Sequence, residues 1–250
     1  MLYGTVLCLG DSLTFGARAV MGYPEHLAPM LSTKDIEWAC LQHGISGQTT
    51  REILDRTPSA VRSLNSLTGP KWVVVLAGTN DSKGGGLSMK TWESLYRQIL
   101  HWPRRFNIPM ALCTFPTVQP HKMPAYTAQS VRWLKRASER VRAIASELDC
   151  GPSPVRLVEL EDMTTDLLCD GVHMTAEGYY EIADRVAEVL TEEKDVTLPI
   201  PKAATEFFTG SKSTKLGSSK RTKVASITEP DKPKKKAKAK RTPRRKLVVP

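Results

Sequence analysis

The sequence predicts an α/β fold, a three-layer α/β/α sandwich built on a parallel sheet of five strands. Short apolar runs alternate along the chain with longer segments whose apolar residues recur at helical spacing. Such alternation is typical of parallel strands joined by right-handed crossover helices. One run, residues 72–77, is apolar throughout, as expected of a central strand that is covered on both faces.

Each expected element follows from its local pattern. Short apolar runs bounded by polar, glycine or proline residues predict strands at residues 5–9, 36–41, 72–77, 108–115 and 155–160. Apolar residues recurring every three or four positions predict helices at residues 23–31, 50–67, 87–106, 127–148 and 176–193. Pro58 is expected to kink or break the second helix, and Pro103 or Asn107 to end the third. By analogy with other open sheets, we expect the flavodoxin-like strand order 2-1-3-4-5.

The charge of the chain is concentrated at one end. The 250 residues carry a formal net charge of +10, but residues 211–250 alone hold 15 Lys and Arg against 2 Asp and Glu. The body of the chain is therefore mildly acidic, which argues against a basic nucleic-acid-binding face on the folded part. Since the apolar periodicity ends at about residue 197 and residues 211–246 have almost no large apolar side chains, we expect a folded domain at residues 1–200 and a disordered Lys/Arg-rich tail at residues 201–250.

The five cysteines show no spacing typical of metal ligands, so we expect no metal site and no cofactor. They stand at positions 8, 40, 113, 150 and 169, and we expect buried, reduced thiols in a reducing compartment. No signal peptide is apparent, and no run approaches the roughly 18 apolar residues of a membrane span. These patterns predict an intracellular protein, either cytoplasmic or nuclear.

Four polar blocks occupy positions where an α/β sheet places its ligands. Residues 10–16, 44–50 and 78–81 follow the first three predicted strands, and residues 170–173 precede the last predicted helix. Since the carboxyl ends of parallel strands meet at one edge of a sheet, the four blocks should converge there.

Together the blocks supply the groups that acyl transfer requires. Ser12 is the expected nucleophile, His173 its general base, and Asp170 the residue that orients the imidazole. The oxyanion of the tetrahedral intermediate needs fixed donors. The backbone N–H groups of Ser12 and Gly47 and the side-chain amide of Asn80 are the expected ones.

The four blocks resemble those of the GDSL esterase/lipase family, also called SGNH hydrolases after Ser, Gly, Asn and His. The resemblance spans about residues 4–193, with the four blocks in the family's order and Asp170 three residues before His173. It implies a flavodoxin-like fold and a metal-independent serine esterase. One departure is Gln42, which stands where the family often has an asparagine, five residues before Gly47. We expect this change to alter the support of the Gly47 loop without abolishing activity.

Simpler interpretations of the same residues remain open. Ser12 at the start of a helix is also a typical N-cap, Asp11 is more typical of a cap than of catalysis, and Asn80 with Asp81 is also a common turn pair. The expected substrate is a small-molecule carboxylic ester. Lysophospholipase, thioesterase or carbohydrate deacetylase activity would use the same groups, and a catalytically silent binding module is the alternative outside enzymes.

The tail has its own open alternatives. Residues 234–246 are rich in Lys and Arg and resemble a nuclear localisation signal, which would bind importin. The same cluster would attach non-specifically to nucleic acid or to an anionic membrane, or it has no specific partner. Nothing in the sequence indicates the oligomeric state.

Overall fold

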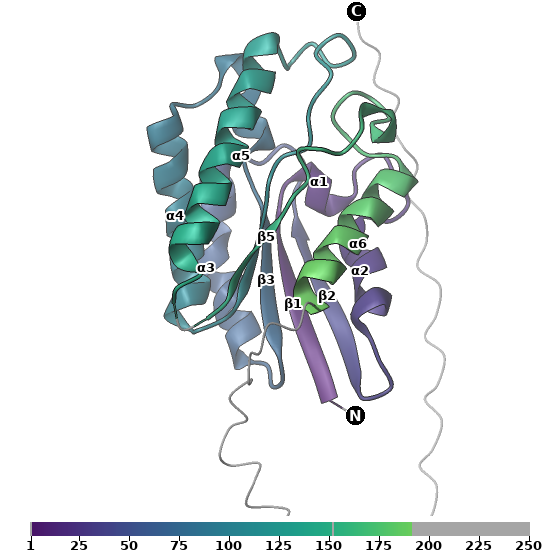
Figure 1. Cartoon of the computed structure of the whole chain (residues 1–250), viewed down its shortest axis with the longest axis vertical. Coiled ribbons are helices and arrows are strands. Elements are labelled where there is room, and N and C mark those ends of the chain that lie inside the picture. Colours follow the sequence, from purple (N-terminus) through teal and green to yellow (C-terminus); the bar gives the residue numbers. More distant parts are fainter. Residues whose placement is uncertain (1, 152, 192–250) are drawn as a thin grey trace, which may run out of the picture. The chain divides into compact units, whose positions relative to one another are not determined.

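The computed structural model describes residues 2–151 and 153–191, and these form a single parallel sheet flanked by helices (Figure 1). The predicted fold class and the strand order β2-β1-β3-β4-β5 are confirmed. The strands are β1 (Leu2–Gly10), β2 (Ile36–Gly44), β3 (Lys71–Leu76), β4 (Met110–Cys113) and β5 (Val155–Val158). The helices are α1 (Ser12–Phe15), α2 (Tyr23–Leu31), α3 (Thr50–Ser66), α4 (Met89–Arg105), α5 (Ala128–Leu148) and α6 (Ala176–Thr191).

The sheet lies between two helical layers. Helices α2 and α6 pack together on one side, and α3, α4 and α5 cover the other (Figure 1). Strands β1 and β3 are buried on both faces over most of their length, which explains why their sequences are almost entirely apolar. Helix α5 turns its buried residues, among them Leu134, Val141 and Ile144, toward the sheet.

The register of the central strands places the ends of three of them at one level. Gly10, the last residue of β1, is paired with Gly44 of β2 and with Leu76 of β3. A side chain at Gly10 would meet the Thr14 side chain and the Leu76 carbonyl at less than 3 Å. The turn after β1 is therefore packed directly onto its neighbours, and the segments that follow the three strands begin side by side.

The predicted boundaries need small corrections at the caps and one larger one. Ser88 and Thr127 are the N-caps of α4 and α5, each accepting a backbone N–H of the first turn, so these helices start one residue or two later than predicted. Of the two outcomes predicted at Pro58, a kink or a break, the break is wrong, because α3 continues through this residue from Thr50 to Ser66. The buried face of α3, which includes Ile53, outweighs the one backbone hydrogen bond that proline removes.

The cysteines only partly follow the prediction. Cys8 and Cys113 are buried and all five thiols are free, but Cys150 and Cys169 are exposed. Both exposed cysteines lie in loops, where no apolar periodicity in the sequence indicates whether a side chain is buried. The predicted boundary at residue 200 and the tail at residues 201–250 lie outside the described residues. Within the described part of the chain, no helix is long and apolar enough to cross a membrane.

Candidate active site

The four polar blocks converge at the carboxyl ends of β1, β2 and β3. Ser12 is the first residue of α1, and Asp11 is the N-cap of that helix, with its Oδ1 atom accepting the Leu13 N–H at 3.0 Å. The expectation that Asp11 serves as a cap is therefore confirmed. Because Ser12 stands at the start of a helix, its own N–H has no acceptor within the helix.

Ser12, His173 and Asp170 form one chain of hydrogen bonds. The Ser12 Oγ lies 3.1 Å from the His173 Nε2, and the His173 Nδ1 lies 2.7 Å from the Asp170 Oδ2. The imidazole is thus within hydrogen-bond reach of the hydroxyl on one side and of the carboxylate on the other. This is the geometry in which a histidine can accept a hydroxyl proton.

The loop that carries Asp170 and His173 is stabilised by hydrogen bonds from its backbone N–H groups to the Asp170 side chain. Asp170 Oδ1 accepts the N–H groups of Val172 and His173, at 3.2 and 2.9 Å. Partial burial acts to raise the pKa of Asp170, but the hydrogen bonds from the His173 ring and from these N–H groups outweigh it and hold that pKa at about 2. The carboxylate is therefore ionised at any pH at which a histidine could act as a base.

Gly47 lies in the loop between β2 and α3, in a backbone conformation that favours glycine. Its φ angle is +83°, and a side chain there would meet no atom within 4 Å. Only the backbone conformation therefore requires glycine, and the space beside Gly47 is open to a ligand. Gln42 partly supports this region, since its Oε1 accepts the Gly44 N–H at 3.1 Å and its Nε2 lies 3.4 Å from the Phe15 carbonyl oxygen.

Asn80 follows β3, and its side chain links three segments. Its Nδ2 donates to the Gln48 carbonyl oxygen at 2.9 Å and to the Asp11 Oδ2 at 3.3 Å, while its Oδ1 accepts from the Tyr126 hydroxyl at 3.3 Å. Both amide hydrogens thus have an acceptor in the described structure. A substrate oxygen would share or replace the longer of the two bonds, the one to Asp11.

Two buried carboxyl groups, those of Asp11 and Asp81, accept hydrogen bonds from the segments that form the site. Asp11 is fully buried, and this burial raises its pKa to about 7. Asp81 accepts the backbone N–H and the hydroxyl of Thr50, at 2.8 and 2.9 Å, and so ties the segment after β3 to the start of α3. Asp81 is therefore structural, as the sequence suggested.

Three residues around the site were not predicted from the sequence. Arg56, on α3, donates to the carbonyl oxygens of Gly10 and His43 and to the Gln48 side chain. Tyr126 contacts Asn80, and Arg18 places its Nε 3.3 Å from the Asp170 Oδ2. None of the three stands in one of the polar blocks. Only contacts between distant segments reveal their roles.

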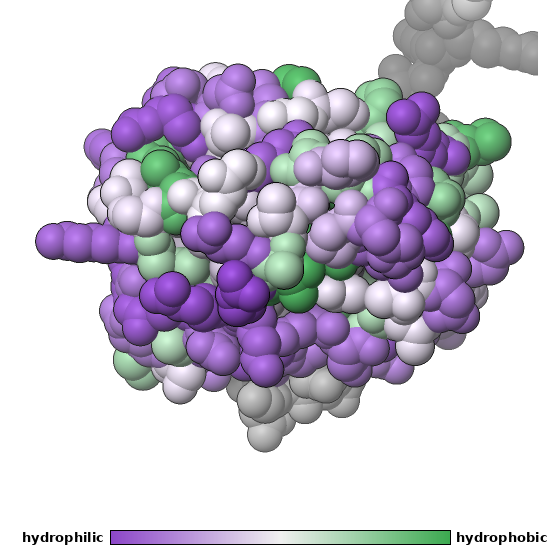
Figure 2. All heavy atoms as spheres, turned by 90° about the horizontal axis from the view of Figure 1, so that it is seen from above, coloured by the Kyte–Doolittle hydropathy of each residue, from purple (hydrophilic) through white to green (hydrophobic). Residues whose placement is uncertain are grey.

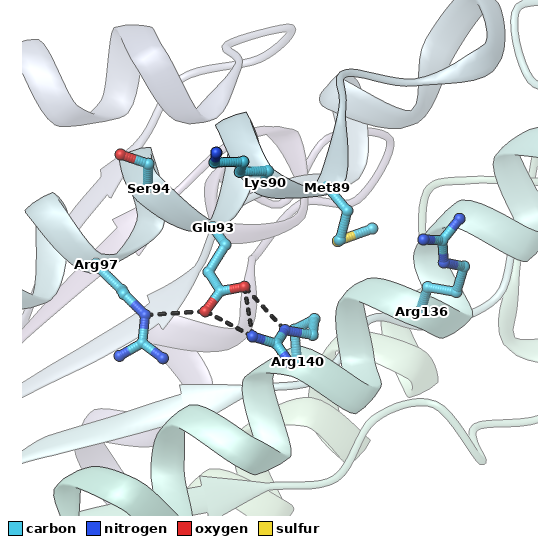
Figure 3. A pocket seen from close by; sticks show the side chains of 7 residues that line it. All are labelled: Met89, Lys90, Glu93, Ser94, Arg97, Arg136 and Arg140. Atoms are coloured by element: carbon cyan, nitrogen blue, oxygen red, sulfur yellow. Dashed lines mark hydrogen bonds and ion pairs between the residues drawn. The ribbon is translucent and has the colours of Figure 1, made fainter.

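A separate cavity lies between α4 and α5, away from these residues. It has a volume of about 590 Å³ and is lined by Met89, Lys90, Glu93, Ser94, Arg97, Arg136 and Arg140 (Figure 3). Glu93 binds both Arg97 on its own helix and Arg140 on α5, so the polar side chains here cross-link two helices. No residue of the four blocks lines this cavity, and we assign it a structural role.

The end of the molecule that carries the site is mainly hydrophilic. Figure 2 views the molecule from above, toward the carboxyl ends of the strands, and shows apolar side chains there in small separate patches. Exposed apolar residues in the loops at this end include Val20, Met21 and Ile45. Across residues 2–151 and 153–191, no group of three His, Cys, Asp or Glu side chains is arranged to hold a metal ion.

Several solved structures share this fold. Est24, a carbohydrate acetylesterase from Sinorhizobium meliloti, has a TM-score of 0.61 at 18% identity, with 74% of this chain and 97% of that chain covered. Axe2, an acetylxylan esterase from Geobacillus stearothermophilus, has a TM-score of 0.61 at 18% identity, with 76% and 94% covered. The acetyl xylan esterase AlAXEase has a TM-score of 0.56 at 25% identity, with 73% and 97% covered.

The sequence itself identifies the family. A comparison with curated proteins found no match. Residues 8–180, more than two thirds of the chain and all four polar blocks, match the GDSL-like lipase/acylhydrolase family. The resemblance drawn from the four blocks is therefore confirmed, and the chain belongs to this family of ester-hydrolysing enzymes.

Proposed function

We propose that this chain is a serine esterase that works through an acyl-enzyme intermediate. The observation that carries the proposal is the hydrogen-bonded chain from Asp170 through His173 to Ser12, with distances of 2.7 and 3.1 Å. A serine hydroxyl is a poor nucleophile until a base accepts its proton, and His173 is the base within reach.

The reaction has two halves. In the first, Ser12 Oγ bonds to the ester carbonyl carbon while its proton passes to His173 Nε2; the imidazolium then gives that proton to the alcohol oxygen as the ester C–O bond breaks. In the second, water attacks the acyl-enzyme, His173 accepts a water proton and returns it to Ser12 Oγ, and the carboxylic acid leaves. Asp170 holds the imidazole with Nδ1 protonated and stabilises its charged form.

Three donors would stabilise the oxyanion of each tetrahedral intermediate. They are the backbone N–H groups of Ser12 and Gly47 and the side-chain amide of Asn80. The helix start at Ser12, the open space beside Gly47 and the fixed amide of Asn80 support this assignment. One such donor contributes roughly 3–4 kcal/mol to the stability of the transition state in comparable sites.

The substrate that we propose is a short-chain carboxylic ester, such as an acetyl ester. The mainly hydrophilic face around the site supports a short acyl group and a polar alcohol (Figure 2). The acetyl xylan esterase at 25% identity favours the same choice, with a carbohydrate as the alcohol. Lysophospholipase or thioesterase activity would instead require preference for long acyl chains. Hydrolysis rates across p-nitrophenyl esters of increasing chain length separate these alternatives.

The test of the proposal is the variant Ser12→Ala. It should lose hydrolysis of p-nitrophenyl acetate and labelling by a fluorophosphonate probe, because both need an activated hydroxyl. The matched control is Ser146→Ala, which removes an exposed hydroxyl on α5 and should leave both readouts unchanged. Full activity of Ser12→Ala would remove this residue from the mechanism. Absence of labelling in the parent protein would favour a catalytically silent binding module.

The domain division and the partners of the basic segment remain part of the proposal. We propose that residues 1–200 hold the hydrolase domain and that the 15 Lys and Arg of residues 211–250 attach it to importin or to another polyanionic partner. Deletion of residues 211–250 should then change the location of the protein without changing turnover of a soluble ester.

A further inference from the structure

Tyr126 places a buried hydroxyl group behind the amide of Asn80. Its side chain is only 4% exposed, and its hydroxyl donates to the Asn80 Oδ1 at 3.3 Å. Tyr126 directly precedes Thr127, the N-cap of the long helix α5. The first turn of that helix is in turn tied to the segment after Asn80, because the Ser130 hydroxyl donates to the Ser82 carbonyl oxygen at 2.7 Å.

The other two partners of Asn80 make the direction of its amide unambiguous. Its nitrogen faces two acceptors, the carbonyl oxygen of Gln48 and the carboxylate of Asp11, so the amide oxygen must point the other way. The Tyr126 hydroxyl is the donor that meets this oxygen. A rotation of the amide would lose both bonds that its nitrogen donates and would bring the amide oxygen against the acceptor atoms of Gln48 and Asp11.

The bond from Tyr126 should also strengthen Asn80 as a donor. A hydrogen bond accepted by an amide oxygen draws electron density away from the nitrogen and makes its N–H groups better donors. Burial raises the pKa of Tyr126, so the phenol keeps its proton and remains a donor over the whole range of pH in which an esterase would work. The Lys83 ammonium group lies 5.4 Å from the centre of the ring and helps to hold it in place.

We propose that Tyr126 is a positioning residue for the oxyanion hole: it fixes and polarises the Asn80 amide without itself contacting the substrate. This inference rests on the proposed role of Asn80 as an oxyanion donor. It extends the site by a residue from the loop between β4 and α5, which contains none of the four polar blocks. A donor that matters only when the oxyanion forms should affect kcat much more than KM.

The first experiment compares Tyr126→Phe with the parent protein on p-nitrophenyl acetate. The variant keeps the ring and its contact with Lys83 but removes the hydroxyl. We expect kcat to fall about three- to tenfold, the effect of one neutral hydrogen bond, with KM changed less than about twofold. The matched control is Tyr180→Phe, an exposed tyrosine on α6 whose kcat should not change. Thermal unfolding of both variants shows whether the fold is intact.

A double-mutant cycle with Asn80→Ala separates positioning from a general structural effect. If Tyr126 acts through Asn80, Tyr126→Phe should have almost no effect on kcat once Asn80 is alanine. Equal losses in both backgrounds, or a rise in KM with kcat unchanged, would overturn the inference while leaving the esterase proposal intact. A parent-like kcat in Asn80→Ala alone would instead remove Asn80 from the oxyanion hole and overturn this inference, while the role of Ser12 would still be decided by Ser12→Ala.

Discussion

The guanidinium of Arg56 offers the sharpest test of how this site is held together. Its three nitrogens donate to the Gly10 carbonyl oxygen at 2.7 Å, to the His43 carbonyl oxygen at 2.8 Å and to the Gln48 Oε1 at 2.7 Å. These acceptors stand at the end of β1, near the end of β2 and beside Gly47. One side chain thus connects the segment before Ser12 with the loop that would supply an oxyanion donor.

The variant Arg56→Met removes all three of these hydrogen bonds and should lower the free energy of unfolding. A hydrogen bond from a charged donor contributes about 1.5–3 kcal/mol when buried. Because Arg56 is only half-buried, water can replace part of each bond, and we count about 1 kcal/mol for each. The free energy of unfolding should therefore fall by about 3 kcal/mol, which a domain with a typical stability of about 5–15 kcal/mol survives. The freed Gly47 loop should lower kcat about tenfold to a hundredfold.

Two assays check this prediction. Urea unfolding gives the change in stability, and hydrolysis of p-nitrophenyl acetate gives kcat. Arg51→Met is the matched control, because Arg51 is an exposed arginine on the same helix and its removal should change neither quantity. Arg56→Lys should recover only part of the loss, since an ammonium group cannot match the fork of a guanidinium. A loss below about 1 kcal/mol together with an unchanged kcat would refute the reasoning.

Two further predictions concern stability and its dependence on pH. Burial raises the pKa of Asp11 from 3.8 to about 7, so the folded state binds the carboxyl proton of Asp11 more tightly than the unfolded state does. The stabilisation that this proton provides is present below pH 3.8 and is lost as the pH rises from 3.8 to about 7. Asp11→Asn should therefore gain stability relative to the parent across this range in urea unfolding; parallel curves would contradict the assignment. Glu93 is bonded by Arg97 and Arg140, which outweigh the effect of burial and lower its pKa from 4.5. Its stabilisation is therefore present above pH 4.5 and lost as the pH falls through its lowered pKa. Glu93→Gln should cost about 1 kcal/mol at neutral pH, since both arginines are partly exposed, and the difference should vanish in acid. A cost that persists there would point to packing instead.

The parts of this protein that the sequence determines by itself are those that depend on neighbouring residues. The apolar run of β3 and the helical spacing of α5 predict their elements because burial on both faces, or along one stripe, leaves a periodic pattern. The link between Asp170 and His173 is also local, since the two residues stand three positions apart in one turn. Ser12 and Asn80 were predictable because the carboxyl ends of parallel strands meet at one edge.

The tertiary structure alone decided the contacts that cross between segments. Arg56 lies 46 residues from Gly10, and Tyr126 lies 46 residues from Asn80. No periodic pattern in the sequence indicates either contact, because each residue binds an atom that is distant along the chain and comes close only when the protein packs. The continuity of α3 through Pro58 was decided in the same way, by a buried face whose total gain exceeds the local cost. Local sequence patterns indicate which face of a helix or strand is buried. Which side chains or backbone atoms contact that face is decided only when the sheet and the helical layers pack together.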